Sequence, residues 1–236
     1  MIAREQYTDA YMVNWESNVF PGVLGRTCDR PCEPACRRGR VEEANAKHPE
    51  PVAICRLKRV AADMKDDVGK RMPKAGRKNG KRVACIGAGP ASLTVARDLA
   101  PLGYEVTVFD GEAKAGGFIR TQIPRFRLPE SVIDEETGYI LDLGVTFRSG
   151  QRIDSMKALL AGEVDGTFDA VFVGCGAPRG RDLDLPGRRQ AAASIHIGID
   201  WLASVSFGHV TSVKKRVIVL GGGNTAMDCC RSARRL

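Results

Sequence analysis

Two kinds of apolar pattern divide the chain. Near the N-terminus, aromatic side chains recur every fourth residue from Tyr7 to Trp15, and Pro51 stands at a helix-start position before an apolar stripe over residues 54–64. Both patterns have the spacing of one helix face, so they predict a helical domain over residues 1–68. A stretch rich in glycine, proline and charge follows over residues 69–81, where we expect a basic linker.

Beyond the linker, short apolar runs alternate with glycine turns. Residues 83–86 and 105–109 are typical of buried strands on either side of a helix that ends at Leu99. Two later apolar runs, 168–173 and 215–220, each end in a glycine-rich turn. Because buried strands joined by helices are typical of parallel sheets, the sequence predicts an α/β, Rossmann-like fold with an internal duplication.

Composition limits the function classes. The chain has 236 residues, 43% of them hydrophobic, and a net charge of +8, of which residues 1–82 carry +7 from 18 basic and 11 acidic side chains. Few aromatic rings accompany these charges, so we do not expect nucleic-acid binding. No stretch approaches the roughly 20 apolar residues of a membrane span, so we expect no membrane association and a cytoplasmic location.

The first glycine turn has the form of a dinucleotide site. Such a site needs a tight turn, close backbone approach to the pyrophosphate, and a small residue where the helix packs on the strand. Asp110, at the end of the next strand, could accept hydrogen bonds from ribose hydroxyls. The alternative is a plain tight turn in an α/β sheet. The candidate residues of this turn are Gly87, Gly89, Pro90, Ala91 and Ser92.

The second glycine turn repeats this form between residues 215–220 and a helix. It has a small residue, Ala226, in the position that Ser92 takes in the first turn. We expect it to bind a second dinucleotide, the alternative being an ordinary glycine-rich loop. Its candidate residues are Gly221, Gly223, Asn224, Thr225 and Ala226.

Four cysteines in the first quarter suggest a metal site. Cys28, Cys32 and Cys36 are spaced four apart, and a helix after Pro31 would place two of them on one face. Cys55 could supply a fourth thiolate, which is the set that iron-sulfur clusters prefer. Several arginines would lower the thiol pKa values and stabilise a reduced cluster. These are Arg26, Arg30, Arg37, Arg38 and Arg40.

Two alternatives for these cysteines stay open. Zinc also binds four thiolates, although its usual pairs of closely spaced cysteines are missing here. Ordinary buried cysteines are the other alternative. For the remaining four we expect packing as small hydrophobic residues. They are Cys85, Cys175, Cys229 and Cys230.

Four parts of the chain, taken in order, resemble a known family. They are the cysteine-rich region, the first glycine turn, residues 116–129 and residues 217–228. The family comprises the small (beta) subunit of glutamate synthase, the N-terminal part of dihydropyrimidine dehydrogenase and related flavoproteins. The resemblance implies 4Fe-4S clusters in the helical domain, an FAD-binding domain over residues 82–190, and the start of an NAD(P)H-binding domain over residues 191–236. Relatives continue for about another domain's length, so we expect that second nucleotide domain to be incomplete here.

The resemblance also implies roles for residues. The first turn would hold the FAD pyrophosphate, and Asp110 its ribose where relatives usually have Glu. Gly116 and Gly117 would let backbone approach the flavin, with Arg120 and Arg127 nearby. A second flavin-contacting turn and the NADPH pyrophosphate turn would follow. Their residues are Gly174 and Gly176 for the flavin, and Gly221, Gly223 and Ala226 for NADPH.

Departures from the family pattern bear on the cluster count. Leu24 stands where many relatives have a cysteine, and Lys58 where some have a Gln or Glu ligand, so we expect one 4Fe-4S cluster. The expected function is an FAD-dependent oxidoreductase subunit that passes electrons from NAD(P)H through flavin and cluster to a redox partner or larger catalytic subunit. The alternatives are a non-catalytic FAD-binding fragment that needs a second chain, and a zinc-stabilised nucleotide-binding module.

Overall fold

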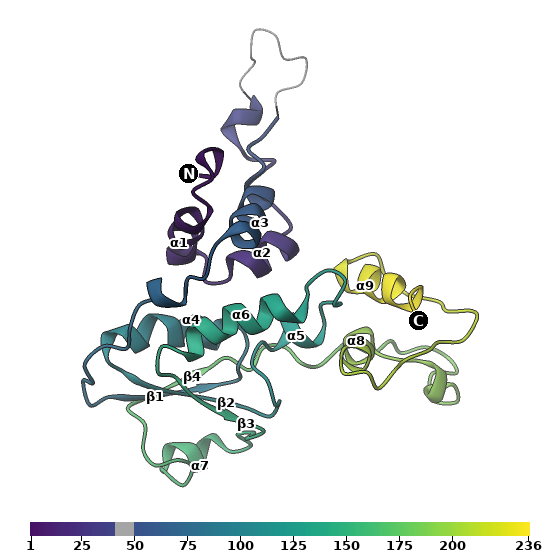
Figure 1. The fold of residues 1–236 in the computed structure, drawn as a ribbon. Helices are drawn as coiled ribbons and strands as arrows, with labels where there is room; N and C mark the ends of the chain where they lie inside the picture. Colours follow the sequence, from purple (N-terminus) through teal and green to yellow (C-terminus); the bar gives the residue numbers. More distant parts are fainter. Residues whose placement is uncertain (41–49) are drawn as a thin grey trace, which may run out of the picture. The chain divides into compact units, whose positions relative to one another are not determined.

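The computed structural model describes residues 1–40 and 50–236, so part of the expected helical domain, residues 41–49, lies outside the described residues. The chain forms two compact units, Met1–Pro73 and Lys74–Leu236 (Figure 1). Their boundary falls inside the stretch expected as a linker. Met72 is buried within the first unit. In the second unit, the Asn79 amide donates to the carbonyl of Gly103 at 3.0 Å, so both halves of the stretch make ordered contacts.

The first unit is helical, as the aromatic spacing predicts. Tyr11 and Trp15 are both buried, and α3 packs against α1 and α2. A Cβ on Gly25 of α2 would lie 2.8 Å from the Cα of Arg59, so the close approach of α2 to α3 requires glycine. The helices are α1 (Tyr7–Ser17), α2 (Pro21–Thr27) and α3 (Ile54–Met64), with 3-10 turns at Ile2–Arg4, Arg37–Arg40 and Gly69–Arg71.

The apolar stripe over residues 54–64 forms α3, as predicted. Of its side chains Ala61 is buried, whereas Ile54, Leu57 and Met64 are exposed. The condition of a helix after Pro31 is not met, and residues 31–35 are turns. Pro34 accounts for this, since the residue before a proline is biased away from the helical conformation.

The second unit is built on a four-stranded parallel sheet. Its order is β3-β2-β1-β4, and β1 pairs with both β2 and β4. Helices α4 and α6 cover one face and α7 lies on the other (Figure 1). The strands are β1 (Arg82–Ile86), β2 (Glu105–Asp110), β3 (Thr146–Ser149) and β4 (Ala170–Val173). The α/β class is therefore as predicted.

The helices of the second unit complete this arrangement. On one side of the sheet, Ala84, Ile86 and Phe109 pack with Leu159 of α7. On the other side, Leu93 and Ile133 are fully buried. The helices are α4 (Pro90–Leu99), α5 (Phe118–Thr121), α6 (Glu130–Leu141), α7 (Met156–Leu160), α8 (Gly198–Ser206) and α9 (Asn224–Ala233), with 3-10 turns at Ala100–Leu102 and Ala192–Ser194.

The strand expected over residues 215–220 is wrong. These residues lie within the described part of the chain and form no strand. Ile218 is 83% exposed and Leu220 66% exposed. A parallel strand needs a hydrogen-bonded neighbour and cover on both faces. The composition favours a strand here, but among the described residues this segment pairs with no strand and its apolar side chains stay exposed.

Candidate functional site

The first glycine turn lies where β1 ends and α4 begins. Gly87 has φ of +93°, which favours glycine, and its amide donates to the carbonyl of Phe109 in β2 at 2.7 Å. Gly89 is the N-cap of α4 and has no side-chain cap. The amides in the first turn of a helix lack helical acceptors, and Pro90 contributes none. The N–H groups of Ala91 and Ser92 are therefore available to a ligand.

The space beside this turn suits a phosphate group. A Cβ on Gly89 would meet no atom of the described residues within 4 Å, so the space in front of the α4 N-terminus is open. Ser92 is fully buried, and its hydroxyl has no hydrogen-bond partner among the described residues. Buried hydroxyls normally have partners, so an unsatisfied one beside an open helix N-terminus fits a site that takes a polar ligand.

Asp110 stands at the carboxyl end of β2, next to this turn. The Ala88 amide donates to Asp110 Oδ2 at 2.6 Å, and the Glu112 amide donates to Oδ1 at 2.8 Å. Each carboxylate oxygen can accept a further hydrogen bond. The side chain is thus held in one orientation and keeps capacity for ribose hydroxyls.

The structure brings two more of the expected turns to the first one. The Gly116 amide donates to the Ala88 carbonyl at 2.8 Å, and a Cβ on Gly117 would lie 2.9 Å from the Cα of Gly89. Gly174 lies against Ser92, and a side chain there would collide with the Ser92 hydroxyl. These glycines permit close approach of three backbone segments around the α4 N-terminus. Gly176 has φ of +66° and a Cβ there would find open space.

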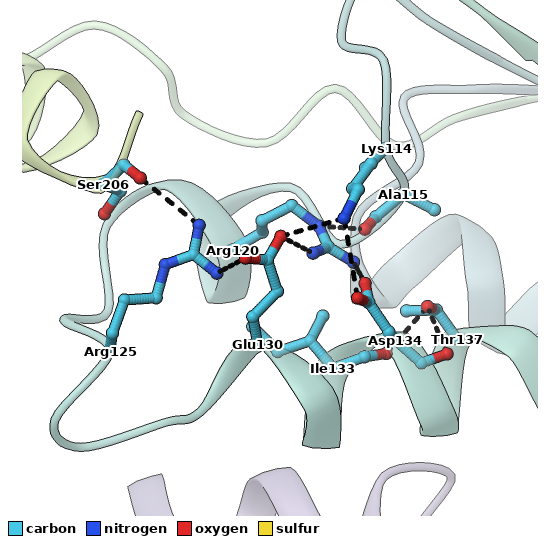
Figure 2. A network of polar contacts seen from close by, with 9 residues as sticks. All are labelled: Lys114, Ala115, Arg120, Arg125, Glu130, Ile133, Asp134, Thr137 and Ser206. Carbon is cyan, nitrogen blue, oxygen red and sulfur yellow. Dashed lines mark hydrogen bonds and ion pairs between the residues drawn. The ribbon is translucent and has the colours of Figure 1, made fainter. Parts of the chain in front are cut away.

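Arg120 is buried and is satisfied within the protein (Figure 2). Its Nε donates to the carbonyl of Ala115 at 2.6 Å, and its two terminal nitrogens donate to Glu130 and Asp134 at 2.9 and 2.6 Å. A Cβ on Gly116 would lie 3.0 Å from the Arg120 Cβ. Arg120 therefore ties the Gly116–Gly117 turn to the start of α6.

The two carboxylates of this network have lowered pKa values. Burial alone would raise the pKa of Glu130, but a hydrogen bond from Lys114 and the charges of Arg125, Lys114 and Arg120 bring it below its ordinary value. For Asp134, burial is likewise outweighed by the hydrogen bond and charge of Arg120, so its pKa is also lowered. Both groups are held in the charged form at neutral pH.

The second glycine turn has the backbone form of the first. The N-cap of α4, Gly89, has φ −80° and ψ 177°, and the N-cap of α9, Gly223, has φ −81° and ψ 176°. Gly221 has φ of +123°, and a Cβ there would be 3.4 Å from the Ala226 Cβ, so the small residue admits a close approach. Helix α9 also has no side-chain cap, which leaves the amides of Thr225 and Ala226 in its first turn available.

Arg127 makes an ion pair with α9. Its Nη1 lies 2.5 Å from Asp228 Oδ2, and the two side chains are 22% and 7% exposed. This contact joins residues 101 positions apart, and no sequence spacing signals it. Asp228 is therefore a residue that sequence analysis missed.

Of the four cysteines in the first unit, Cys28 and Cys55 share a hydrogen-bond acceptor. The Cys28 amide and the Cys55 thiol both donate to the carbonyl of Leu24. Hydrogen bonds from the backbone at Val52 and Arg38 lower the pKa of the Cys36 thiol, and Cys32 is exposed. Across residues 1–40 and 50–236, however, no three His, Cys, Asp or Glu side chains are arranged to hold a metal ion. The donor chemistry fits a cluster, but the described geometry does not bring the four thiols together.

The other four cysteines differ from one another. Burial raises the pKa of the Cys85 and Cys229 thiols to about 11, as expected of packing residues. Cys175 and Cys230 are exposed, so the expectation that they pack in the core is wrong.

Comparison with known proteins places these features in a family. Residues 81–236, more than half of the chain, match the model for pyridine nucleotide-disulphide oxidoreductases. The chain belongs to the pyridine nucleotide-disulphide oxidoreductase family. Residues 1–70 of this oxidoreductase match the model described as dihydropyrimidine dehydrogenase domain II, 4Fe-4S cluster. The matches confirm the expected fold class and cofactors, since they imply FAD and NAD(P)H for the second region and a 4Fe-4S cluster for the first.

Several curated proteins are similar to this oxidoreductase. The NADP(+)-dependent formate dehydrogenase subunit beta of Moorella thermoacetica is 34% identical over 98% of this chain and 34% of its own length. The NADPH-Fe(3+) oxidoreductase subunit beta of Geobacter sulfurreducens is 38% identical over 92% of this chain and 31% of its own length. The glutamate synthase [NADPH] small chain of Mycobacterium tuberculosis is 32% identical over 100% of this chain and 49% of its own length.

These similarities confirm the resemblance noted from the sequence. The oxidoreductase spans between about a third and a half of the length of these relatives. In the described part of the chain, no helix combines the length and the apolar character needed to cross a bilayer.

Proposed function

We propose that this chain is an electron-transfer subunit that binds FAD at the first glycine turn. The observation that carries this proposal is the convergence at the α4 N-terminus. An open space in front of Gly89, an unsatisfied buried Ser92 hydroxyl, and the backbones of Gly117 and Gly174 all meet there. The positive end of the α4 dipole and its unpaired amides would stabilise a pyrophosphate.

FAD would supply the exchange between two-electron and one-electron steps. The chain's own residues would position it. The amides of Ala91 and Ser92 would donate to phosphate oxygens, and Asp110 would accept from the ribose. Gly117 and Gly174 would keep side chains out of the space beside the dinucleotide. The Arg120 network would keep the Gly116–Gly117 turn in place.

We further propose NAD(P)H as the ligand of the second turn. Its support is the backbone match between Gly89 and Gly223 and the uncapped amides of Thr225 and Ala226. Cys28, Cys32, Cys36 and Cys55 are the proposed ligands of the 4Fe-4S cluster. The lowered pKa of Cys36 supports a thiolate ligand at that position.

A partner protein completes the proposal. The similar formate dehydrogenase and Fe(3+) oxidoreductase proteins are named beta subunits, and the glutamate synthase relative is a small chain. We propose that this chain likewise passes electrons to a redox partner or larger catalytic subunit, in the cytoplasm. The second candidate, a non-catalytic FAD-binding fragment that needs another chain, is favoured by one observation: residues 215–220 form no strand in the described structure.

An anaerobic absorption spectrum of the purified chain, with iron and acid-labile sulfide assays, tests the cofactor assignments together. The proposal predicts flavin bands at one flavin per chain and about four iron and four sulfide per chain. Zinc in place of iron would contradict the assignment of a 4Fe-4S cluster. A chain that holds no flavin after incubation with FAD would contradict the assignment of FAD to the first glycine turn.

A further inference from the structure

Three successive residues, Arg125, Phe126 and Arg127, contact the C-terminal helices of the second unit. Arg125 Nη2 donates to the carbonyl of Ser206, the last residue of α8, at 3.3 Å. The guanidinium carbons of two arginines lie 4.8 and 3.9 Å from the centre of the Phe126 ring. They are Arg231 of α9 and Arg235, which follows the end of that helix. Residues 125–127 are named the clasp below.

The ion pair between Arg127 and Asp228 anchors the clasp. Both side chains are largely removed from water, and an unpaired buried charge is costly, so each partner strongly favours the paired geometry. Asp228 lies only two residues beyond Ala226, which closes the second glycine turn. A constraint on Asp228 therefore constrains the orientation of the α9 N-terminus, since the intervening backbone is helical.

The chain segment that carries the clasp begins beside the first glycine turn. Gly116 and Gly117 contact Ala88 and Gly89, and the chain runs from there through α5 to the clasp. Arg120 fixes the near end of this segment on α6. One end of this segment therefore contacts the first glycine turn, and the other end contacts α9, the helix that follows the second glycine turn.

We propose that Arg127 and Asp228 are a positioning pair. The pair holds the second glycine turn, at the N-terminus of α9, in a fixed orientation relative to the first glycine turn. This inference rests on the proposed function. It gives Arg127 a role in the arrangement of the two sites through α9, without requiring contact with the flavin. The pair would limit how far the nicotinamide dinucleotide can move from the flavin, because positioning is most of what protein contributes to hydride transfer.

Hydrogen exchange of the full chain, read by mass spectrometry, tests the pair. Asp228→Asn keeps the shape of the side chain but removes its charge. We expect the amides of residues 224–233 to exchange at least tenfold faster in this variant, while residues 82–110 keep the parent rates. The charge swap Arg127→Asp with Asp228→Arg should recover most of the protection. Asp200→Asn, an exposed acid on α8, is the matched control and should match the parent.

The outcomes separate this inference from the proposed function. Unchanged exchange of α9 in Asp228→Asn would overturn the positioning role. So would a faster exchange that the charge swap fails to reverse, or one that spreads equally over the sheet, since both indicate a general loss of packing. A flavin measurement on the same parent sample is read separately: absence of flavin overturns the proposed function and with it the functional meaning of the pair.

Discussion

Arg120 shows how one side chain organises a turn. Its guanidinium has a carbonyl on one side and two carboxylates on the other, and its side chain is only 5% exposed. The carboxylates themselves are 38% and 47% exposed, so solvent screens much of their attraction. The main structural consequence is the fixed position of Gly116 and Gly117 against the first glycine turn.

Replacing Arg120 by Ala should lower the free energy of unfolding of the second unit by about 2 kcal/mol, through lost charge-assisted hydrogen bonds. Urea unfolding followed by circular dichroism measures this. Arg152→Ala is the control, because Arg152 and its partner Asp154 are 81% and 77% exposed, and its effect should be near zero. Equal effects of the two variants would contradict the account.

The same variant should change the pH dependence of stability. The pKa values of Glu130 and Asp134 are lowered in the folded state, so their stabilisation is present above the ordinary carboxylate range. It is lost as pH falls through the lowered folded-state values. Urea midpoints measured from pH 6 down to pH 3 should therefore fall less steeply in Arg120→Ala than in the parent. Identical slopes would show that Arg120 does not stabilise these carboxylates.

The proposed cluster ligands can be tested one thiol at a time. Cys28→Ser, Cys32→Ser, Cys36→Ser and Cys55→Ser should each lower iron content well below the parent, since a 4Fe-4S cluster needs four ligands. Cys230→Ser is the control, because that thiol is exposed on α9 and should leave iron unchanged. A Cys55→Ser protein with full iron and an unchanged reduced-state EPR spectrum would make Cys55 a packing residue of α3.

At the scale of elements, the buried strands and the helices next to them could be predicted. Residues 83–86 are apolar and residues 106–109 are buried, as in strands covered on both faces, and Gly89 and Pro90 mark the start of α4. Strand β3 could not be predicted, because three of its four residues, Thr146–Ser149, are exposed and form no apolar run. The contacts at the first glycine turn could be predicted only through the family resemblance, since residues 116–129 have no strand or helix pattern of their own.

The segment 215–220 has the composition of a strand but pairs with no strand in the described part of the chain. We therefore expect its amides to exchange with solvent within seconds at neutral pH, whereas those of β1 (Arg82–Ile86) should be protected for at least a thousand times longer. Hydrogen exchange read by mass spectrometry on the full chain compares the two directly. Protection of residues 215–220 comparable to that of β1 would mean that they join a sheet after all.

In the whole molecule, different cofactors belong to different parts of the chain. The family matches assign a 4Fe-4S cluster to residues 1–70 and dinucleotide binding to residues 81–236. The basic excess lies in the first 82 residues, where arginines near the thiolates would stabilise a reduced cluster. Electron transfer in this account needs both units and a second nucleotide turn that is held against the flavin.

Residues 1–236 alone should reduce bound FAD slowly with either NADPH or NADH. The clasp orients the N-terminus of α9, but residues 215–220 before the turn form no strand, so the orientation of α9 alone does not fix the nicotinamide beside the flavin. Stopped-flow absorbance of the anaerobic chain at the flavin maximum measures this. Rapid and saturable bleaching would show that an unpaired segment 215–220 does not limit hydride transfer.

We propose that the open space in front of Gly89 holds the pyrophosphate of FAD. Gly89 and Gly138 offer a matched comparison, because a Cβ at either position meets no described atom within 4 Å and neither has a positive φ. The most direct measurement is the flavin content of purified Gly89→Val and Gly138→Val proteins with parent-like circular dichroism. We expect less than a tenth of the parent flavin in Gly89→Val and the parent amount in Gly138→Val. Parent-level flavin in a folded Gly89→Val protein would contradict it.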